Sequence, residues 1–276
     1  MAASTHTGDA TEPRLDPVID RFYTESFDEA ARLSADAVGR LELERTRELL
    51  ARLLPAPPAR ILDVGGGPGV YASWLAGLGY EVTLVEPVSR HRDQAAAHGT
   101  FAVEDGDARA LAAADGSANA VLMLGPLYHL HEAADRARAL SEAWRVARPG
   151  SGLIVAAFIS RHAPLIDVAA RLRINDDEFV RYLARFRGSG RNEGDRGFTT
   201  AYFHTVPEIH ADFAAAGLPE PQVLGIEGPL LSLITSGLVE DRPDFLEAAV
   251  RAARLAEDDP ALLAANAHLL AVAHRR

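Results

Sequence analysis

The sequence contains no cysteine and no lysine, and these two absences exclude several classes of chemistry. Without cysteine the chain can form no disulfide, thiolate nucleophile or cysteine-ligated zinc or iron–sulfur site. All 28 basic residues are Arg, so lysine Schiff-base chemistry, including that of pyridoxal enzymes, is also excluded. Basic residues that are exclusively Arg, together with a high Ala content, predict a bacterial protein from a GC-rich genome.

The chain also lacks a basic excess and a long apolar run. Its net charge of −11 argues against a nucleic-acid partner, because such a partner requires a basic face. No segment reaches the roughly 18 apolar residues that a membrane helix needs. Residues 1–14 are small and polar, without the apolar core of a signal peptide. We therefore expect a soluble cytoplasmic protein with no membrane partner, and a homodimer stays open.

Short apolar segments alternate with helical patterns through the first half of the chain. With 276 residues, 48% of them hydrophobic, a single domain with one sizeable core is expected. Strands are expected at residues 60–64, 81–85, 100–103, 120–124 and 152–158. Helices are expected at residues 70–78, 89–97, 108–113 and 133–147. This alternation predicts an α/β fold with a Rossmann-like, mostly parallel sheet and helices on both faces.

The flanking regions are expected to add helices to this sheet. Residues 18–54 read as one helix within an N-terminal lid, 1–55, and the cofactor-binding core would be 56–158. A substrate-side insertion, 159–205, would hold helical stretches at 167–172 and 178–186 and a Gly-rich loop at 188–197. The remaining part, 206–276, would contain a helix at 206–215, strands at 222–226 and 268–274, and a helical insertion at 238–266.

One segment carries most of the functional information. Residues 61–69 read as a buried strand with an acid, Asp63, followed by a turn rich in glycine: Gly65, Gly66, Gly67 and Gly69. Glycines let the backbone turn sharply and let a ligand approach peptide N–H groups that a Cβ would block. The spacing resembles motif I of the class I S-adenosyl-L-methionine (SAM)-dependent methyltransferases. That resemblance implies that the loop cradles the amino-acid end of SAM and that the last strand is antiparallel.

The same resemblance assigns further residues to the cofactor. Glu86, followed by Pro87 at the end of the second strand, would accept both ribose hydroxyls. Asp107 and the Ala108 N–H would hold the adenine edge, although Asp107 also suits a helix N-cap. Leu124 would close the pocket after the fourth strand, and Tyr23 would fold over it from the N-terminal lid.

Dinucleotide binding is the main competing interpretation of the glycine loop. Gly67, Gly69 and Ala72 satisfy a loose G-x-G-x-x-A pattern, and Glu86 lies about where a ribose-binding acid should be. Two acidic features favour SAM: Asp63, where a dinucleotide strand is normally apolar, and the cluster at residues 104–107.

The segment Gly125–His131 follows the fourth strand and would face the transferable methyl group. His129 and His131 are the candidate general bases, and packing or hydrogen bonding is the alternative for each. Metal-dependent catechol-type enzymes place an Asp where this chain has Leu124, so no metal is expected. The Gly-Pro-Leu-Tyr sequence also departs from the tetrad of enzymes that methylate nucleobase amines.

We therefore predict SAM-dependent methyl transfer (EC 2.1.1) to O, N or C of a small molecule, in secondary metabolism. Acceptor contacts should come from residues 1–50, 159–205 and 230–266, with His162, Tyr202 and His204 as weaker candidates. Three alternatives stay open: a non-methyl reaction such as a cyclisation in the same fold, an NAD-dependent oxidoreductase, and a non-catalytic SAM-binding accessory protein.

Overall fold

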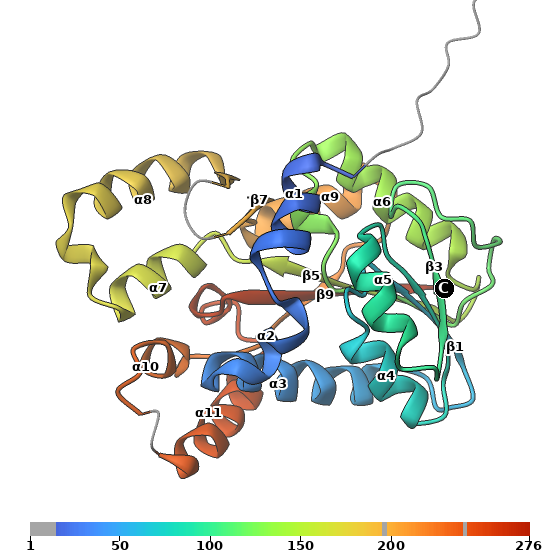
Figure 1. The fold of residues 1–276 in the computed structure, drawn as a ribbon, viewed down its shortest axis with the longest axis horizontal. Coiled ribbons are helices and arrows are strands. Elements are labelled where there is room, and N and C mark those ends of the chain that lie inside the picture. The colour runs from blue at the N-terminus through green and yellow to red at the C-terminus, as the bar shows by residue number, and fades with distance from the viewer. Residues whose placement is uncertain (1–14, 195–197, 240–241) are drawn as a thin grey trace, which may run out of the picture.

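A computed structural model of the protein describes residues 15–194, 198–239 and 242–276. The expectation for residues 1–14 lies outside these ranges. The centre of the fold is a seven-stranded sheet with the order β3-β2-β1-β4-β5-β9-β8 (Figure 1). Its strands are β1 Arg60–Val64, β2 Glu81–Val85, β3 Ala102–Glu104, β4 Ala120–Met123, β5 Gly152–Ile159, β8 Gln222–Gly225 and β9 His268–Arg275.

Strand direction confirms the predicted fold class. β1 to β5 pair in parallel, whereas β9 pairs antiparallel with both β5 and β8. The chain runs outward from β1 to β3 and then returns to the other side of β1 with β4. Such a reversal leaves a crevice at the carboxyl ends of the two central strands, where open α/β sheets bind ligands.

Alternate strand residues face two separate apolar layers. On one face, Ile61, Leu84 and Leu122 pack with α3 (Ala37–Leu53), α4 (Val70–Gly77) and α5 (Ser89–Ala96). On the other face, Leu62 and Val121 pack with α6 (Ala133–Val146) and α9 (Val206–Ala215). Because both faces are buried at the centre of the sheet, β4 and β5 are apolar throughout rather than alternating.

The prediction of one helix over residues 18–54 is wrong. The segment forms α1 (Pro17–Arg21), a π-helical turn (Phe22–Ser26), α2 (Glu29–Ala35) and α3. Asp36 breaks the helix, because its side chain accepts a hydrogen bond from the Gly39 N–H at 2.8 Å and caps α3. A Cβ on Gly39 would lie 2.4 Å from the Arg32 carbonyl oxygen, so glycine is required where α2 crosses α3.

Two further local predictions are also wrong. Residues 108–113 form turns instead of a helix, since the Asp107 side chain binds the Arg109 N–H and Glu142 binds the Leu111 N–H. The expected loop at 188–197 contains a short strand, β6 (Arg191–Glu193), which pairs with β7 (Thr200–Tyr202). Residues 195–197 of that loop lie outside the described part of the chain.

The remaining helices border the carboxyl ends of the strands or the edge of the sheet. α7 (Ala163–Ala170) and α8 (Asp177–Ser189) project together as a lobe at the left of Figure 1. α10 (Leu231–Thr235) and α11 (Pro243–Ala256) follow β8, and α11 is shorter than the expected 238–266. Within the described ranges, no helix has the length and apolarity that crossing a membrane requires.

Candidate active site

A cavity of about 340 Å³ lies at the crevice between β1 and β4. Its walls come from the glycine loop after β1, the ends of β2 and β4, the turn after β3, and the N-terminal segment. Nearly every residue predicted from the sequence lines it: Tyr23, Asp63, Gly65, Gly66, Gly67, Glu86, Pro87, Asp107, Ala108, Leu124, His129 and His131. Gly69 is the exception among the predicted cofactor and catalytic residues. The assignment of these residues to SAM, and of His129 and His131 to catalysis, stays a prediction.

The glycine loop favours glycine at each position, either by its backbone conformation or by lack of space for a Cβ. Gly65 and Gly67 have φ values of +66° and +57°, in the left-handed region that favours glycine. A Cβ on Gly66 would lie 2.7 Å from Asp63 Oδ2, and one on Gly65 would lie 2.9 Å from Pro126 Cδ. Gly69 precedes α4 with φ +87°, and a Cβ there would meet Phe101 at 2.7 Å. Gly69 therefore allows helix packing, whereas the three preceding glycines keep the cavity wall bare.

Asp63 is a buried carboxylate that no hydrogen bond from the described residues stabilises. It is 0% exposed, and neither of its carboxylate oxygens has a hydrogen-bond partner in the described part of the chain. Burial, followed by the nearby charge of Glu86, raises the pKa of Asp63 to about 7. An unpaired buried carboxylate is unfavourable, so this position is suited to a ligand that brings positive charge or a hydrogen-bond donor.

Glu86 joins the end of β2 to the glycine loop. One carboxylate oxygen accepts the Gly67 N–H at 2.9 Å, and the other accepts the Val88 N–H at 2.9 Å. The His91 ring nitrogen Nδ1 lies 3.5 Å from the second oxygen. The side chain therefore fixes the conformation of the loop and also lines the cavity.

Asp107 is more constrained than the sequence indicated. The Arg109 guanidinium donates to both of its oxygens, at 2.9 and 2.7 Å, and the Arg109 backbone N–H donates at 2.8 Å. Burial alone would raise the pKa of Asp107, but these hydrogen bonds hold it below its ordinary value. A ligand at Asp107 would have to share the carboxylate with Arg109, whereas Ala108 also lines the cavity.

Tyr23 and His129 meet across the mouth of the cavity. The Tyr23 hydroxyl lies 3.0 Å from His129 Nε2, and His129 Nδ1 lies 3.2 Å from the Thr200 carbonyl oxygen. Because a carbonyl only accepts, Nδ1 carries the proton and Nε2 accepts from the tyrosine. Burial lowers the pKa of His129 to about 4, so the imidazole is neutral.

His131 lies in the same loop but is held differently. Its carbonyl oxygen accepts a hydrogen bond from Arg136 at 2.9 Å, while its Nε2 atom has no partner among the described residues. Of the two predicted bases, His129 is therefore part of a defined hydrogen-bonded chain and His131 is not.

A second cavity, of about 400 Å³, adjoins the first. Four residues line both cavities: Tyr23, Glu29, Arg32 and Tyr128. Its other walls come from α7, α8, the β6–β7 hairpin and α10, with aromatic side chains at Phe179, Tyr182, Phe198 and Phe203. These elements belong to the inserted regions from which acceptor contacts were predicted.

A buried ionic cluster lies beside the second cavity. Arg32 binds Glu42 through two nitrogens, at 2.6 and 3.0 Å, and His268 Nδ1 lies 2.5 Å from Glu227. Although burial opposes it, the two carboxylates raise the pKa of His268 to about 9. Glu42, Glu227 and His268 could together reach one metal ion, but their ligand atoms are already paired with each other or with Arg32. The expectation of a metal-free enzyme stays a prediction.

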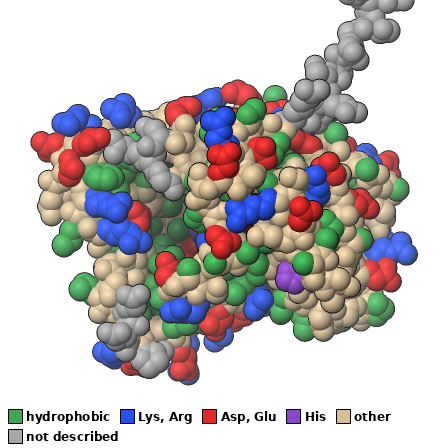
Figure 2. Space-filling model, viewed as in Figure 1, with side chains coloured by type: hydrophobic (Ala, Val, Ile, Leu, Met, Phe, Trp, Pro, Cys, Tyr) green, Lys and Arg blue, Asp and Glu red, His purple; other side chains and the backbone are tan. Residues whose placement is uncertain are grey.

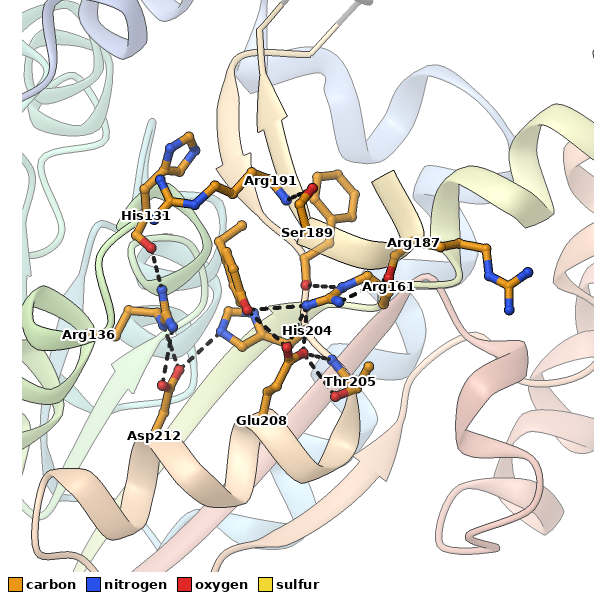
Figure 3. A network of polar contacts seen from close by, with 12 residues as sticks. His131, Arg136, Arg161, Arg187, Ser189, Arg191, His204, Thr205, Glu208 and Asp212 are labelled. Carbon is orange, nitrogen blue, oxygen red and sulfur yellow. Dashed lines mark hydrogen bonds and ion pairs between the residues drawn. The ribbon is translucent and has the colours of Figure 1, made fainter. Parts of the chain in front are cut away.

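Figure 3 shows a polar network that holds the loop carrying His131 through hydrogen bonds to its backbone. Arg136 binds Asp212 at 2.6 Å and donates to the carbonyl oxygens of Leu130 and His131 at 2.9 Å. His204 is fully buried, with Nε2 3.1 Å from Asp212. His162, Tyr202 and His204 line neither cavity, so the structure gives no support to the weaker prediction that they contact the acceptor.

Several residues that line the first cavity were not predicted. Tyr128 stands in the loop already singled out, and its position next to His129 was a usable signal. His91 and Arg109 each follow a predicted acid at a short interval, which was a weaker signal. Glu29 and Arg32 come from a segment whose sequence carries no motif, and only tertiary packing brings them to the cavity.

The sequence of this chain is similar to those of known methyltransferases. The family model described as a methyltransferase domain matches residues 62–155. A malonyl-[acyl-carrier protein] O-methyltransferase of Methylococcus capsulatus is 30% identical over 229 residues, which cover 79% of this chain and 78% of the relative.

Solved structures show the same fold at lower sequence identity. A SAM-dependent methyltransferase from Thermotoga maritima, described as a possible histamine N-methyltransferase, has a TM-score of 0.59 at 20% identity; the match covers 94% of this chain and 99% of that one. The [4+2]-cyclase SpnF has a TM-score of 0.53 at 17% identity, with 84% of this chain and 81% of that one covered. These two likenesses establish the fold alone.

Proposed function

Because the chain belongs to the class I SAM-dependent methyltransferases and uses SAM as its cofactor, we propose that it methylates a small organic acceptor held in the second cavity. The observation that carries the proposal is the junction of the two cavities at Tyr23, Glu29, Arg32 and Tyr128. A methyl group can pass between two ligands only where their sites meet in line.

The first cavity fits the cofactor on two features of its walls. The glycine loop brings bare backbone to the cavity, with a Cβ excluded at Gly65 and Gly66 by Pro126 and Asp63, and Asp63 offers a carboxylate without a hydrogen-bond partner among the described residues. In the proposed assignment, Gly65 to Gly67 and Asp63 face the amino-acid end, Glu86 the ribose, and Ala108 the adenine. When bound, SAM supplies a methyl group that its sulfonium already activates.

Tyr23 and His129 are proposed to handle the proton of an O–H or N–H acceptor. The lone pair of His129 Nε2 is occupied by the tyrosine, so a proton reaches the imidazole only through the Tyr23 hydroxyl. In that step Tyr23 accepts the proton of the acceptor and passes its own proton to Nε2. His129 is buried and has a pKa of about 4, so it is a weak base. A weak base is sufficient here, because the acceptor atom becomes strongly acidic as its bond to the methyl group forms.

The second cavity favours an acceptor with an apolar or aromatic body. Phe179, Tyr182, Phe198 and Phe203 provide apolar walls, and the neighbouring charges are mostly paired within the protein. We place the reaction in secondary metabolism, where insertions around one fold adapt it to different acceptors. The methylated atom is not assigned.

A carrier-bound acid is a second candidate acceptor. The relative that is 30% identical to this chain acts, by its name, on a malonyl group attached to acyl carrier protein. A tethered acyl group of that kind would still enter the second cavity as a small organic ligand.

The proposal is tested by incubating the protein with SAM and a panel of phenols, amines, carboxylic acids and acyl carrier protein substrates. Release of S-adenosylhomocysteine with matching methylated product, detected by mass spectrometry, is the expected result. Glu86→Ala is the matched control and should lower the signal. Binding of SAM without release for any acceptor class would instead favour the non-catalytic accessory protein.

A further inference from the structure

Glu29 brings a carboxylate oxygen without a hydrogen-bond partner to the junction of the two cavities. One of its oxygens accepts the Arg32 Nε–H at 2.7 Å, and the other, Oε2, accepts no hydrogen bond from any described residue. Burial raises the pKa of Glu29 above its ordinary value, although Arg32 opposes the rise. Because Glu29 lines both cavities, a ligand that brings a hydrogen-bond donor to the junction can fill this position.

The Glu29 side chain stands close to the proposed path of the proton. Its Cγ atom lies 3.7 Å from the position that a Cβ on Gly67 would occupy, so it packs against the glycine loop. Burial raises the pKa of Tyr23, and the neighbouring Tyr128 and Glu29 add to the rise. Tyr23 donates its hydroxyl proton to His129, which leaves the lone pairs of its oxygen able to accept. The junction therefore presents two oxygens, Glu29 Oε2 and the Tyr23 hydroxyl, to donors on one ligand.

The cation at the junction, Arg32, is already paired with carboxylates. Its Nε donates to Glu29, and its two other nitrogens donate to Glu42 at 2.6 and 3.0 Å. The other cationic side chains of the second cavity do not line the first: Arg171, Arg173 and His268. A reacting carboxylate would therefore meet the Glu29 carboxylate without a cation to neutralise it, which disfavours a carrier-bound acid as the acceptor.

Beyond the junction the second cavity suits an aromatic body. Figure 2 shows a hollow at the left of the molecule, between the lobe formed by α7 and α8 and the helix α10, with green apolar side chains inside it. Aromatic side chains contribute much of the wall of the second cavity: Phe179, Tyr182, Phe198 and Phe203. An aromatic ring that packs against them can direct one polar substituent toward the junction.

We propose that Glu29 selects a primary aromatic amine as the methyl acceptor: Oε2 accepts one N–H of the amine while the Tyr23 hydroxyl oxygen accepts the other. The inference rests on the proposed function and names its acceptor class. Such an amine is uncharged near neutral pH, donates two hydrogen bonds and keeps a lone pair for the new bond. A phenol donates only one hydrogen bond, and a carboxylate donates none. A site that binds an N–H rejects analogues that lack it, because its own polar group is then left unpaired.

The weak base in the first cavity is consistent with this acceptor class. In methyl transfer the nitrogen lone pair forms the bond to carbon, and the sulfur keeps the electron pair of the bond that breaks. The nitrogen is then positively charged and loses one proton to the Tyr23 hydroxyl, whose own proton passes to His129 Nε2. A methylated aromatic ammonium is acidic enough to give its proton to a weak base. The Glu29 carboxylate stabilises the positive charge until that proton has left.

The test compares three probes that share one aromatic body: para-phenoxyaniline, para-phenoxyphenol and para-phenoxybenzoate. Equilibrium dialysis against the full-length chain saturated with S-adenosylhomocysteine gives their dissociation constants. The wild type should bind the amine at least about tenfold more tightly than the carboxylate and about threefold more tightly than the phenol. This comparison requires no variant, so it does not depend on the folding of a mutant.

Glu29→Gln tests the residue itself while keeping the size of the side chain. Its amide oxygen should face the Arg32 Nε–H, which turns the NH₂ group toward the ligand and replaces an acceptor by a donor. The variant should bind the amine at least about tenfold more weakly, and the carboxylate more tightly, than the wild type does.

Glu247→Gln is the matched control. Glu247 also accepts a hydrogen bond from an arginine, Arg251, at 2.6 Å, but it lies on α11 and lines neither cavity. The control should keep all three dissociation constants within about twofold of those of the wild type.

Tighter binding of the phenol or the carboxylate than of the amine by the wild type, or no binding of the amine, would overturn the assignment. Equal losses of amine and S-adenosylhomocysteine affinity in Glu29→Gln would also overturn it, since Glu29 would then serve the cofactor. If the phenol or the carboxylate probe is methylated with SAM and the amine is not, only the acceptor class fails. If the wild type binds no probe and methylates no member of the acceptor panel, the proposed function fails as well.

Discussion

The two cavities are built in different ways, although they share a wall. The first is formed by loops at the carboxyl ends of neighbouring strands, whose backbone is fixed by the sheet. The second is lined by residues far apart in the chain, which lie in the ranges 23–38, 159–192, 198–203, 231–235 and 267–268, and by Tyr128. A rigid backbone suits a ligand that never changes, whereas side chains on insertions can be exchanged to fit another acceptor. In the proposed function the cofactor is therefore bound by the scaffold and the acceptor by its additions.

Their electrostatics differ as well. The first cavity contains a buried carboxylate, Asp63, that the described protein leaves without a hydrogen bond. Beside the second cavity, Glu29 and Glu42 are bound by Arg32, and Glu227 is bound by His268. The first site therefore has a negative charge to offer a cationic ligand, while the second presents mostly neutral and aromatic surface.

The largest expected effect concerns the wall between the cavities. His129→Ala should lower kcat about a hundredfold for an acceptor that loses a proton, since the partner of the Tyr23 hydroxyl is removed. The SAM dissociation constant, measured by calorimetry, should stay within about twofold of the wild type. His131→Ala is the control and should have a much smaller effect on kcat. Equal losses in both variants would remove His129 from its special role.

The next effect should be confined to the first cavity. Glu86→Ala should weaken SAM binding tenfold or more, about 1.4 kcal/mol, because it removes a proposed ribose contact and two hydrogen bonds that shape the glycine loop. Glu86→Gln keeps the size of the side chain and part of its hydrogen bonding, so calorimetry should give an intermediate affinity. An alanine variant that binds SAM as the wild type does would exclude Glu86 from the site.

The affinity for SAM should depend on pH, because the first cavity contains Asp63, a buried acid without a hydrogen-bond partner among the described residues. Since the pKa of Asp63 is raised to about 7, the group is mostly protonated at pH 6 and mostly ionised at pH 8. A cationic ligand should therefore bind several-fold more tightly as pH rises through 7. Titration of SAM into the wild type and Asp63→Asn at both pH values checks this. A slope of equal size in the variant would mean that another group is responsible.

The smallest effect should be confined to the second cavity. Phe198→Ala should raise the KM for the acceptor about fivefold, because it removes one apolar wall and its ring contacts with Phe203 and Tyr128. The SAM affinity should not change, and Phe198→Leu should recover most of the loss. Steady-state kinetics with either substrate varied measures both quantities. A matching loss of SAM affinity would mean that the two cavities are not separate sites.

The difference between the two cavities also explains which features the sequence could predict. β1 and β2 have the predicted bounds, and Gly65, Gly66 and Gly67 form a turn that lines the first cavity, because strand, turn and acid are adjacent in the chain. The π-helical turn, the break at Asp36 and the positions of Glu29 and Arg32 were not predictable, since helical periodicity continues through that segment. Their conformation depends on packing against α3 and on the pairing of Arg32 with Glu42, contacts between residues that sequence periodicity does not relate.

The role of His129 was only half predictable for the same reason. Its place after β4 indicated proximity to the reaction centre. Its partner, Tyr23, lies 106 residues earlier, and the acceptor of its Nδ1 proton lies 71 residues later. Those two contacts determine its tautomer, whereas burial lowers its pKa, and neither contact is encoded near His129 in the chain.

The central claim is that the first cavity binds the cofactor and the second binds the acceptor. Its most direct test is a crystal structure of the protein with S-adenosylhomocysteine and an acceptor identified from the panel. The account predicts the nucleoside between the glycine loop, Glu86 and Ala108, and the acceptor among Phe198, Tyr182 and Tyr128, with the atom to be methylated facing the sulfur. Finding S-adenosylhomocysteine in the aromatic cavity, or the acceptor outside it, would contradict the account.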